Sequence, residues 1–357
     1  MQAQNRIHSI DALRGLTVAA MLVVNDAGDW NHVYPWLEHA EWSGCNMADF
    51  IFPFFMLIVG VSLSLALGPQ LERGVEPALL RHSVLLRGTR IFLLGIILHY
   101  VAALLLPGRE FRLLGVLQRI GFCFALVGML AIYVRDARVQ WGIFVAILLG
   151  YWALLRSYGS YLPDANLADH VDSALLGRLA YNFDKVTGHA HDPEGVLSTL
   201  PSVATVIFGL RAGAWLRTGR ERMLILVGIV SIVVAYFWAE ALPLNKQLWT
   251  SSFILWAGGF GLLAIALAHH LIDKHGWPAL GRSLGVNAIA AYAGSWLATC
   301  VLIGFGIMPR LYTLAFAEPL GPTFGPFVPS FAFALAFAAV FWLAMRYMLK
   351  RGWRISI

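Results

Sequence analysis

Long apolar runs separated by short polar segments make up most of the chain. Ten of them have about 20 mainly apolar residues, the length that a helix needs to cross a bilayer. They cover approximately residues 10–27, 47–68, 88–106, 113–133, 139–157, 197–215, 223–241, 250–270, 284–305 and 327–348. Their apolar residues are continuous rather than alternating, which excludes a membrane β-barrel. The pattern predicts an all-α, polytopic transmembrane helical bundle of about ten spans, forming a single domain over residues 1–357.

Composition supports this class of protein. Hydrophobic residues are 59% of the chain, charged residues 13%, and the mean hydropathy is +0.69. A soluble domain has about 25% charged residues, so this chain cannot cover itself with a polar surface. No Lys/Arg tract is dense enough for a phosphate backbone, so we expect no nucleic acid partner. Cys45, Cys123 and Cys300 are too far apart for a disulfide framework or a metal motif.

The distribution of basic residues predicts the orientation. If the N-terminus is inside, only eight of the 26 Lys and Arg residues lie on outer loops or outer helix ends, and 18 lie inside. The positive-inside rule then places both termini in the cytoplasm, and we expect a multi-pass protein of the bacterial inner membrane. Residues 28–46 and 158–196 become outer segments. They are too long for simple connections and rich in Trp, Tyr, His, Asp and Glu, so we expect ordered caps over an outward-facing site.

The first outer segment holds the densest group of chemically useful side chains. His39 has a side chain suited to proton transfer near neutral pH. Asp49 opens an apolar run, where a carboxylate needs a partner, and orienting a histidine is one such role. The alternative is that His39 is an interfacial histidine beside an aromatic-belt residue, Trp42. Spacing alone favours this alternative.

Three further positions carry polar groups in or beside apolar runs. Gln118 and Arg119 lie inside the fourth run, where the Arg fork either binds a phosphate or carboxylate or extends to the lipid headgroups. Asp11 and Arg14 are three residues apart and share a helix face, so they can form a local pair. Asn287 enters the ninth run and either bonds across helices or contacts a ligand.

Residues 189–195, His-Ala-His-Asp-Pro-Glu-Gly, precede the sixth run. Their His and acidic side chains suggest zinc, but the spacing matches no known zinc motif. Asp192 and Glu194 in an Asp-Pro-Glu-Gly sequence are more typical of a turn with acidic groups at a helix N-terminus. We therefore expect no metal.

Several short motifs, in order, resemble the heparan-alpha-glucosaminide N-acetyltransferase family, including bacterial NagX-type proteins. They are Ser9-Ile-Asp-Ala-Leu-Arg-Gly15, Val24-Asn25, His39-Ala-Glu-Trp-Ser-Gly44, Ala48-Asp-Phe-Ile-Phe-Pro-Phe-Phe55 with Gly60, Gly115-Val-Leu-Gln-Arg119, Asp192-Pro-Glu-Gly195, Lys246-Gln-Leu-Trp249 and Leu284-Gly-Val-Asn287. The resemblance covers essentially the whole chain, and so implies a single transmembrane acyltransferase domain.

The resemblance implies acetyl transfer from cytosolic acetyl-CoA to a glucosamine-type amine on the far side of the membrane. The family's active-site histidine falls on His39, its aspartate on Asp49 and its asparagine on Asn25. We expect a free or oligomeric amino sugar as acceptor, and a homodimer in the lipid bilayer.

On this interpretation His39 is the base, or carries the acetyl group itself, and sequence does not separate these routes. Asp49 orients the imidazole, and Asn25 donates to the developing oxyanion. The remaining assignments concern the two substrates. We expect acetyl-CoA to be bound by Arg14, Gln118, Arg119 and Asn287, the last three lining a passage for the thioester arm. We expect the sugar to be bound by Trp42, Asp192 and Glu194. Two rival functions stay open: a transporter of N-acetylglucosamine or a related sugar, and an O-acyltransferase of envelope glycans.

Overall fold

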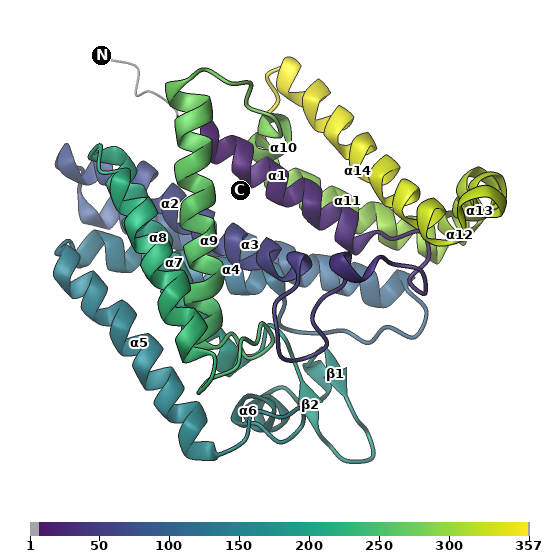
Figure 1. The fold of residues 1–357 in the computed structure, drawn as a ribbon, viewed down its shortest axis with the longest axis horizontal. Helices are drawn as coiled ribbons and strands as arrows, with labels where there is room; N and C mark the ends of the chain where they lie inside the picture. Colours follow the sequence, from purple (N-terminus) through teal and green to yellow (C-terminus); the bar gives the residue numbers. More distant parts are fainter. Residues whose placement is uncertain (1–6, 356–357) are drawn as a thin grey trace.

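The computed structural model describes residues 7–355, which fold almost entirely into helices (Figure 1). The α-helices are α1 (His8–Asn25), α2 (Ile51–Glu72), α3 (Pro77–Leu105), α4 (Val116–Tyr133), α5 (Ala137–Tyr158), α6 (Leu167–Leu175), α7 (Val196–Arg217), α8 (Arg222–Trp238), α9 (Ser251–Ala268), α10 (Arg282–Val286), α11 (Ala288–Gly304), α12 (Ile307–Tyr312), α13 (Glu318–Phe324) and α14 (Phe327–Lys350). Short 3-10 turns occur at Pro35–Leu37, Met47–Phe50 and Gly177–Leu179, and π-helical turns at His269–Lys274 and Thr313–Ala317. One antiparallel pair joins β1 (Asn182–Phe183) to β2 (Ala190–His191).

Every one of the ten predicted apolar runs contains a helix, but fewer helices than ten meet the requirements for a membrane span. Within residues 7–355, seven helices are long and apolar enough, and α11 with the segment 307–324, bent by 89°, makes up to eight. Helix α8 is apolar but has only 17 residues, and α1 carries Asp11 and Arg14. The all-α polytopic class is therefore confirmed, whereas the count of ten spans is not.

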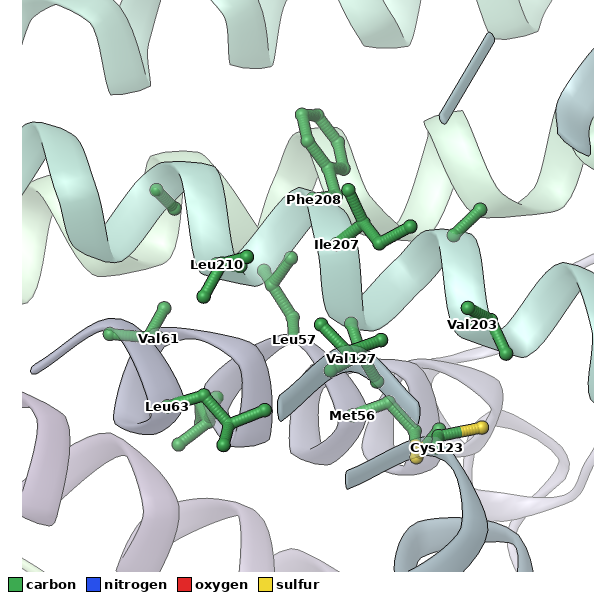
Figure 2. Close-up of a cluster of buried hydrophobic side chains, with 14 of the residues drawn as sticks. Met56, Leu57, Val61, Leu63, Cys123, Val127, Val203, Ile207, Phe208 and Leu210 are labelled. Carbon is green, nitrogen blue, oxygen red and sulfur yellow. The ribbon is translucent and has the colours of Figure 1, made fainter. Parts of the chain in front are cut away.

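The core forms where α2 packs against α7 (Figure 2). Met56, Leu57 and Val61 from α2 contact Ile207 and Phe208 from α7 in one buried cluster. Glycines let the two backbones approach closely. A Cβ atom at Gly60 would lie 2.0 Å from the Val206 carbonyl oxygen, and one at Gly209 would lie 2.0 Å from that of Leu57. Small residues at such crossings are typical of membrane helix packing, where close contact replaces the hydrophobic effect.

Contacts between helix ends define two opposite faces of the bundle. On the first, which we call the terminal face, Asp273 accepts a hydrogen bond from the His8 backbone N–H at 2.8 Å, and Asn287 accepts one from the Ile355 N–H at 3.0 Å. The ion pair between Arg217 and Glu72 lies on the same face. Both described chain ends therefore lie on one side, as the prediction for the termini requires.

The second face, which we call the loop face, is formed by residues 26–50, 159–195 and 239–250. Figure 1 shows α6 and the two strands gathered at this end of the bundle. The Trp42 indole N–H donates to the Tyr161 carbonyl at 2.7 Å, and the Gly44 N–H donates to the Leu244 carbonyl at 2.8 Å. The two long segments predicted as caps are thus ordered, and a third connection joins them.

Candidate active site

His39 and Asp49 form a hydrogen-bonded pair on the loop face. The Nδ1 atom of His39 lies 2.8 Å from Oδ1 of Asp49. The second carboxylate oxygen accepts from the backbone N–H groups of Ala40 at 3.0 Å and Asn46 at 2.9 Å. Asp49 is only 1% exposed, so the carboxylate fixes both the loop and the ring. A carboxylate on Nδ1 favours a proton there, which leaves the lone pair on Nε2.

Lys246, from the connection between α8 and α9, is the third member of this group. Its Nζ lies 3.0 Å from Nδ1 and 3.2 Å from Nε2 of His39, and 3.5 Å from Oδ1 of Asp49. Burial lowers the pKa of the Lys246 ammonium, although the charges of Asp49 and Glu194 oppose this shift. Sequence reasoning did not single out Lys246. Its only signal was its place in a motif shared with the family.

A cavity of about 890 Å³ starts at this group. Its lining includes His39, Asp49 and Lys246 from the loop face together with Arg14 and Arg87 from helices that end at the terminal face. Between these ends the lining is largely apolar, with Val18, Met21, Phe55, Val59, Ile91, Val116, Ile120 and Ile289 among its members. One cavity therefore connects a histidine at one end with arginines at the other.

Arg112 holds two carboxylates beside the loop-face end of the cavity. It lies 2.8 Å from Asp192 and 2.5 Å from Glu194, and its guanidinium packs over the Tyr181 ring at 4.7 Å. Burial alone would raise the pKa of Glu194, but the charges of Arg112 and Arg119 hold it below its ordinary value. Glu194 lines the cavity and stays ionised. Asp192 is 2% exposed and is not among the described lining residues.

At the terminal-face end, the predicted pair of Asp11 and Arg14 is confirmed, with a separation of 3.3 Å. Arg14 also donates to the Ser62 hydroxyl at 2.7 Å and to the Gly285 carbonyl at 3.2 Å, and it lines the cavity. Arg87 lies over the Phe124 ring at 5.3 Å. Sequence reasoning missed Arg87, because it is one of several arginines that begin the third apolar run.

Three residues expected along the passage lie elsewhere. Gln118, Arg119 and Asn287 are not among the described residues that line the cavity. Gln118 donates to the Leu113 carbonyl at 3.0 Å. Arg119 is 2% exposed, bonds the Ser198 hydroxyl and lies 5.2 Å from the Trp249 ring. Asn287 bonds the backbone of the C-terminal segment instead. Among the described residues, Gln118 Oε1 and the Nε and Nη1 atoms of Arg119 are buried without a hydrogen-bond partner.

Two other predicted residues do line the cavity. Asn25 is the last residue of α1 and is exposed. Trp42 joins the two long loops, and its ring packs 5.5 Å from that of His191. Both ring nitrogens of His191 have hydrogen-bond partners: Nδ1 lies 2.5 Å from Asp169 and Nε2 lies 2.5 Å from Gln247.

The segment before α7 forms a turn. The Gly195 N–H donates to the Asp192 carbonyl at 2.9 Å, as the Asp-Pro-Glu-Gly sequence predicted. Among the described residues, no group of three or more His, Cys, Asp or Glu side chains is arranged to hold a metal ion. The turn therefore accounts for the acidic residues before α7.

Comparison with known proteins gives the family. The family model described as "Heparan-alpha-glucosaminide N-acetyltransferase, catalytic" matches residues 6–226. This chain belongs to that family. The mouse heparan-alpha-glucosaminide N-acetyltransferase is 26% identical over an alignment of 351 residues that covers 81% of this chain and 53% of the mouse protein. The human protein is 26% identical over 350 residues, covering 81% of this chain and 52% of its own length. The chain thus spans about half the length of these relatives.

Proposed function

We propose that this member of the heparan-alpha-glucosaminide N-acetyltransferase family is a transmembrane N-acetyltransferase. It transfers acetyl from cytosolic acetyl-CoA to the amine of a glucosamine-type sugar on the other side of the membrane. The names of its relatives supply the reaction class. The observation that carries the proposal for this chain is the cavity that joins the His39–Asp49 pair to Arg14 and Arg87.

Each end of the cavity suits one substrate. Coenzyme A carries several phosphates, and arginine donors match phosphate geometry. Arg14 and Arg87 are therefore our candidates for the coenzyme end. An amino sugar is cationic until it loses a proton, and the ionised Glu194 with the aromatic Trp42 suits such a ligand at the loop face. Gln118, Arg119 and Asn287 are left out of this assignment because they are not among the described residues that line the cavity.

His39 supplies the base in this scheme. With Nδ1 bound to Asp49, Nε2 takes a proton from the sugar ammonium or from the attacking amine. Direct attack of the amine on the thioester and an acetyl-histidine relay both need this nitrogen. The structure supports Nε2 as the reactive atom in either route.

The direct test is an acetylation assay with the purified protein, labelled acetyl-CoA and glucosamine. We expect N-acetylglucosamine to form, and His39→Ala to lower the rate by about 10²–10⁴-fold, the usual contribution of a base. His32→Ala is a matched control, because His32 also pairs with a carboxylate, Asp29 at 2.7 Å, but does not line the cavity. Near-normal turnover of His39→Ala would overturn the assignment.

The same preparation separates the rival functions. Sugar uptake into vesicles without acetyl-CoA would favour a transporter. Acetylation of a hydroxyl acceptor in preference to the amine would favour an O-acyltransferase. Product formation that depends on both acetyl-CoA and a free amine supports the proposed enzyme.

Sidedness has its own test. We place the terminal face in the cytoplasm of a bacterial inner membrane because of the positive-inside distribution. Val186, on the loop face, is 94% exposed. In a Cys45→Ser background, a cysteine introduced by Val186→Cys should therefore be labelled from outside by a membrane-impermeant reagent. Arg73→Cys at the terminal face should be protected. The reverse pattern would overturn the orientation.

A further inference from the structure

The contact between Lys246 and His39 has a consequence for the reaction. Asp49 occupies Nδ1 of the imidazole at 2.8 Å, so Nε2 is the nitrogen with a free lone pair. Lys246 Nζ lies 3.2 Å from that nitrogen and 3.0 Å from Nδ1, within hydrogen-bond distance of both. Since Nδ1 holds the proton that Asp49 accepts, Nε2 is the ring nitrogen that can accept from Lys246. An ammonium group has three donors and no acceptor, so it donates to Nε2. The ammonium of Lys246 therefore caps the base.

A capped base cannot accept a proton from the sugar. The amine reaches Nε2 only if Lys246 turns away, and the charge of the ammonium then needs a new partner. Asp49 Oδ1, at 3.5 Å, holds the ammonium near the reacting groups. Lys246 lines the cavity and its side chain is 19% exposed, so the ammonium is accessible to a ligand in the cavity.

We propose that Lys246 moves its hydrogen bond from His39 Nε2 to the thioester carbonyl oxygen when both substrates bind, and there stabilises the oxyanion. This inference rests on the proposed acetyl transfer. A base that holds the amine within hydrogen-bond distance places the thioester carbonyl next to that amine. A cation about 3 Å from the base is then within reach of the carbonyl oxygen, where negative charge develops.

The step balances as follows. The amine nitrogen attacks the carbonyl carbon, and the C=O π electrons move to the oxygen, which accepts a hydrogen bond from Lys246. His39 Nε2 takes one proton from the nitrogen. When the electron pair returns, the C–S bond breaks, and the coenzyme A thiolate takes the proton from His39. The products are the N-acetyl amide and coenzyme A, and Lys246 returns to its contact with Nε2.

Asn25 is the competing candidate for the same role. It lines the same cavity and has a neutral amide donor. Among the described contacts, however, its side chain has no hydrogen bond to His39 or Asp49, whereas Lys246 contacts both. A full charge at the reacting centre also stabilises an oxyanion more strongly than a neutral amide does.

The experiment compares kcat and KM in four variants of the full chain. We expect Lys246→Met to lower kcat by about 10²–10³-fold, the effect of losing one oxyanion donor. KM of Lys246→Met for acetyl-CoA should change by less than about threefold. The kcat of Lys246→Arg should be at least about tenfold higher than that of Lys246→Met, because arginine keeps the positive charge. Lys185→Met is the matched control, since Lys185 pairs with Glu110 at the protein surface. Asn25→Ala should lower kcat by less than Lys246→Met.

Four outcomes would overturn the inference. The first two are an unchanged kcat in Lys246→Met and an effect of Lys246→Met on KM alone. The third is no recovery of rate in Lys246→Arg, provided that Lys246→Met and Lys246→Arg both melt at the wild-type temperature. The fourth is a larger loss of kcat in Asn25→Ala than in Lys246→Met. A wild-type protein without acetyl-CoA-dependent activity would instead refute the proposed function. The two failures are thus distinguishable.

Discussion

The two ends of the cavity differ in charge as well as in position. The loop-face end is lined by groups of both signs: the carboxylates of Asp26, Asp49 and Glu194, the imidazole of His39, the ammonium of Lys246, and the guanidinium groups of Arg109 and Arg112. The terminal-face end is lined by arginines, hydroxyls and an amide, from Arg14, Ser62, Gln70, Ser83 and Arg87, with no carboxylate among the described lining residues there. The wall between the two ends is largely apolar.

This difference separates two kinds of ligand. An end with paired charges of both signs can hold a cationic amine and move its proton. An end with arginines and neutral donors attracts an anion and has nothing to abstract a proton. The apolar middle suits an uncharged linker between them. We therefore expect substitutions at the loop-face end to change kcat, and substitutions at the terminal-face end to change KM for acetyl-CoA.

After His39→Ala, the substitution at the loop-face end that should cost most is Asp49→Asn. The amide cannot hold the Nδ1 proton of His39 as a carboxylate does, so the imidazole loses its preferred tautomer and orientation. We expect kcat to fall by about 10²–10³-fold with little change in KM for acetyl-CoA. Steady-state kinetics and a melting curve measure this. A change confined to KM would break the comparison between the two ends.

A smaller effect should follow from Arg87→Ala or Arg14→Ala. Each removes a guanidinium from the terminal-face end, and we expect KM for acetyl-CoA to rise about tenfold, the equivalent of about 1.4 kcal/mol, while kcat is largely kept. Arg73→Ala is the control, because Arg73 is exposed on the same face and bonds the carbonyl of Pro69 in its own helix. If Arg87→Ala, Arg14→Ala and Arg73→Ala all raised KM for acetyl-CoA equally, the terminal-face end of the cavity would have no specific role in binding acetyl-CoA.

Arg119→Met should affect stability rather than substrate binding. Arg119 is buried, packs over Trp249 and donates to Ser198, and it does not line the cavity. Its removal leaves the Ser198 hydroxyl without this donor, and we expect a loss of about 1–3 kcal/mol. Thermal unfolding in detergent measures it. A normal melting temperature with a raised KM for acetyl-CoA would return Arg119 to the binding site.

The smallest effect should be a change in pH dependence. Burial raises the pKa of Asp172 to about 7 from the ordinary 3.8, against the opposing hydrogen bond from the Val196 N–H. The folded protein therefore keeps this proton where the unfolded chain has lost it, and stability falls as the pH rises from about 4 to 7. Asp172→Asn keeps an oxygen acceptor without the charge.

We expect Asp172→Asn to melt at least about 2 °C above the wild type at pH 8 and close to it at pH 4. Scanning calorimetry or dye-based melting at several pH values would check this. The Asp184→Asn variant is the control, because Asp184 lies at the surface of the same loop. A variant with the same advantage at both pH values would rule out titration of Asp172 as the cause.

Local patterns were enough to predict much of the molecule. Each of the ten apolar runs contains a helix, because a helix in a membrane needs a continuous apolar surface against lipid or its neighbours. The shorter helices α6, α12 and α13 lie outside these runs. The pair of Asp11 and Arg14 followed from helical spacing. His39 and Asp49 are only ten residues apart, and their pairing followed from the cost of a lone carboxylate together with the family motif.

The number of spans did not follow from the same runs. Hydropathy averages over a window and does not detect a break, so it missed the interruption at Asn287 and the 89° bend after α11. Similarly, a polar residue in an apolar run looks functional until its partner is known. Arg119 faces Ser198 and Trp249 on two other segments, and no local pattern contains them.

The sequence by itself determined the class of protein, the positions of its long apolar helices, its family and the histidine–aspartate pair, because these depend on composition and short spacing. Only the tertiary structure decided which polar groups share a cavity. Lys246 lies 207 residues from His39, and Arg87 and Arg14 come from different helices. These residues come close together only because of the way α1, α2, α3 and the α8–α9 connection pack. Packing between segments that are distant in the chain produces no local sequence pattern from which it could be predicted.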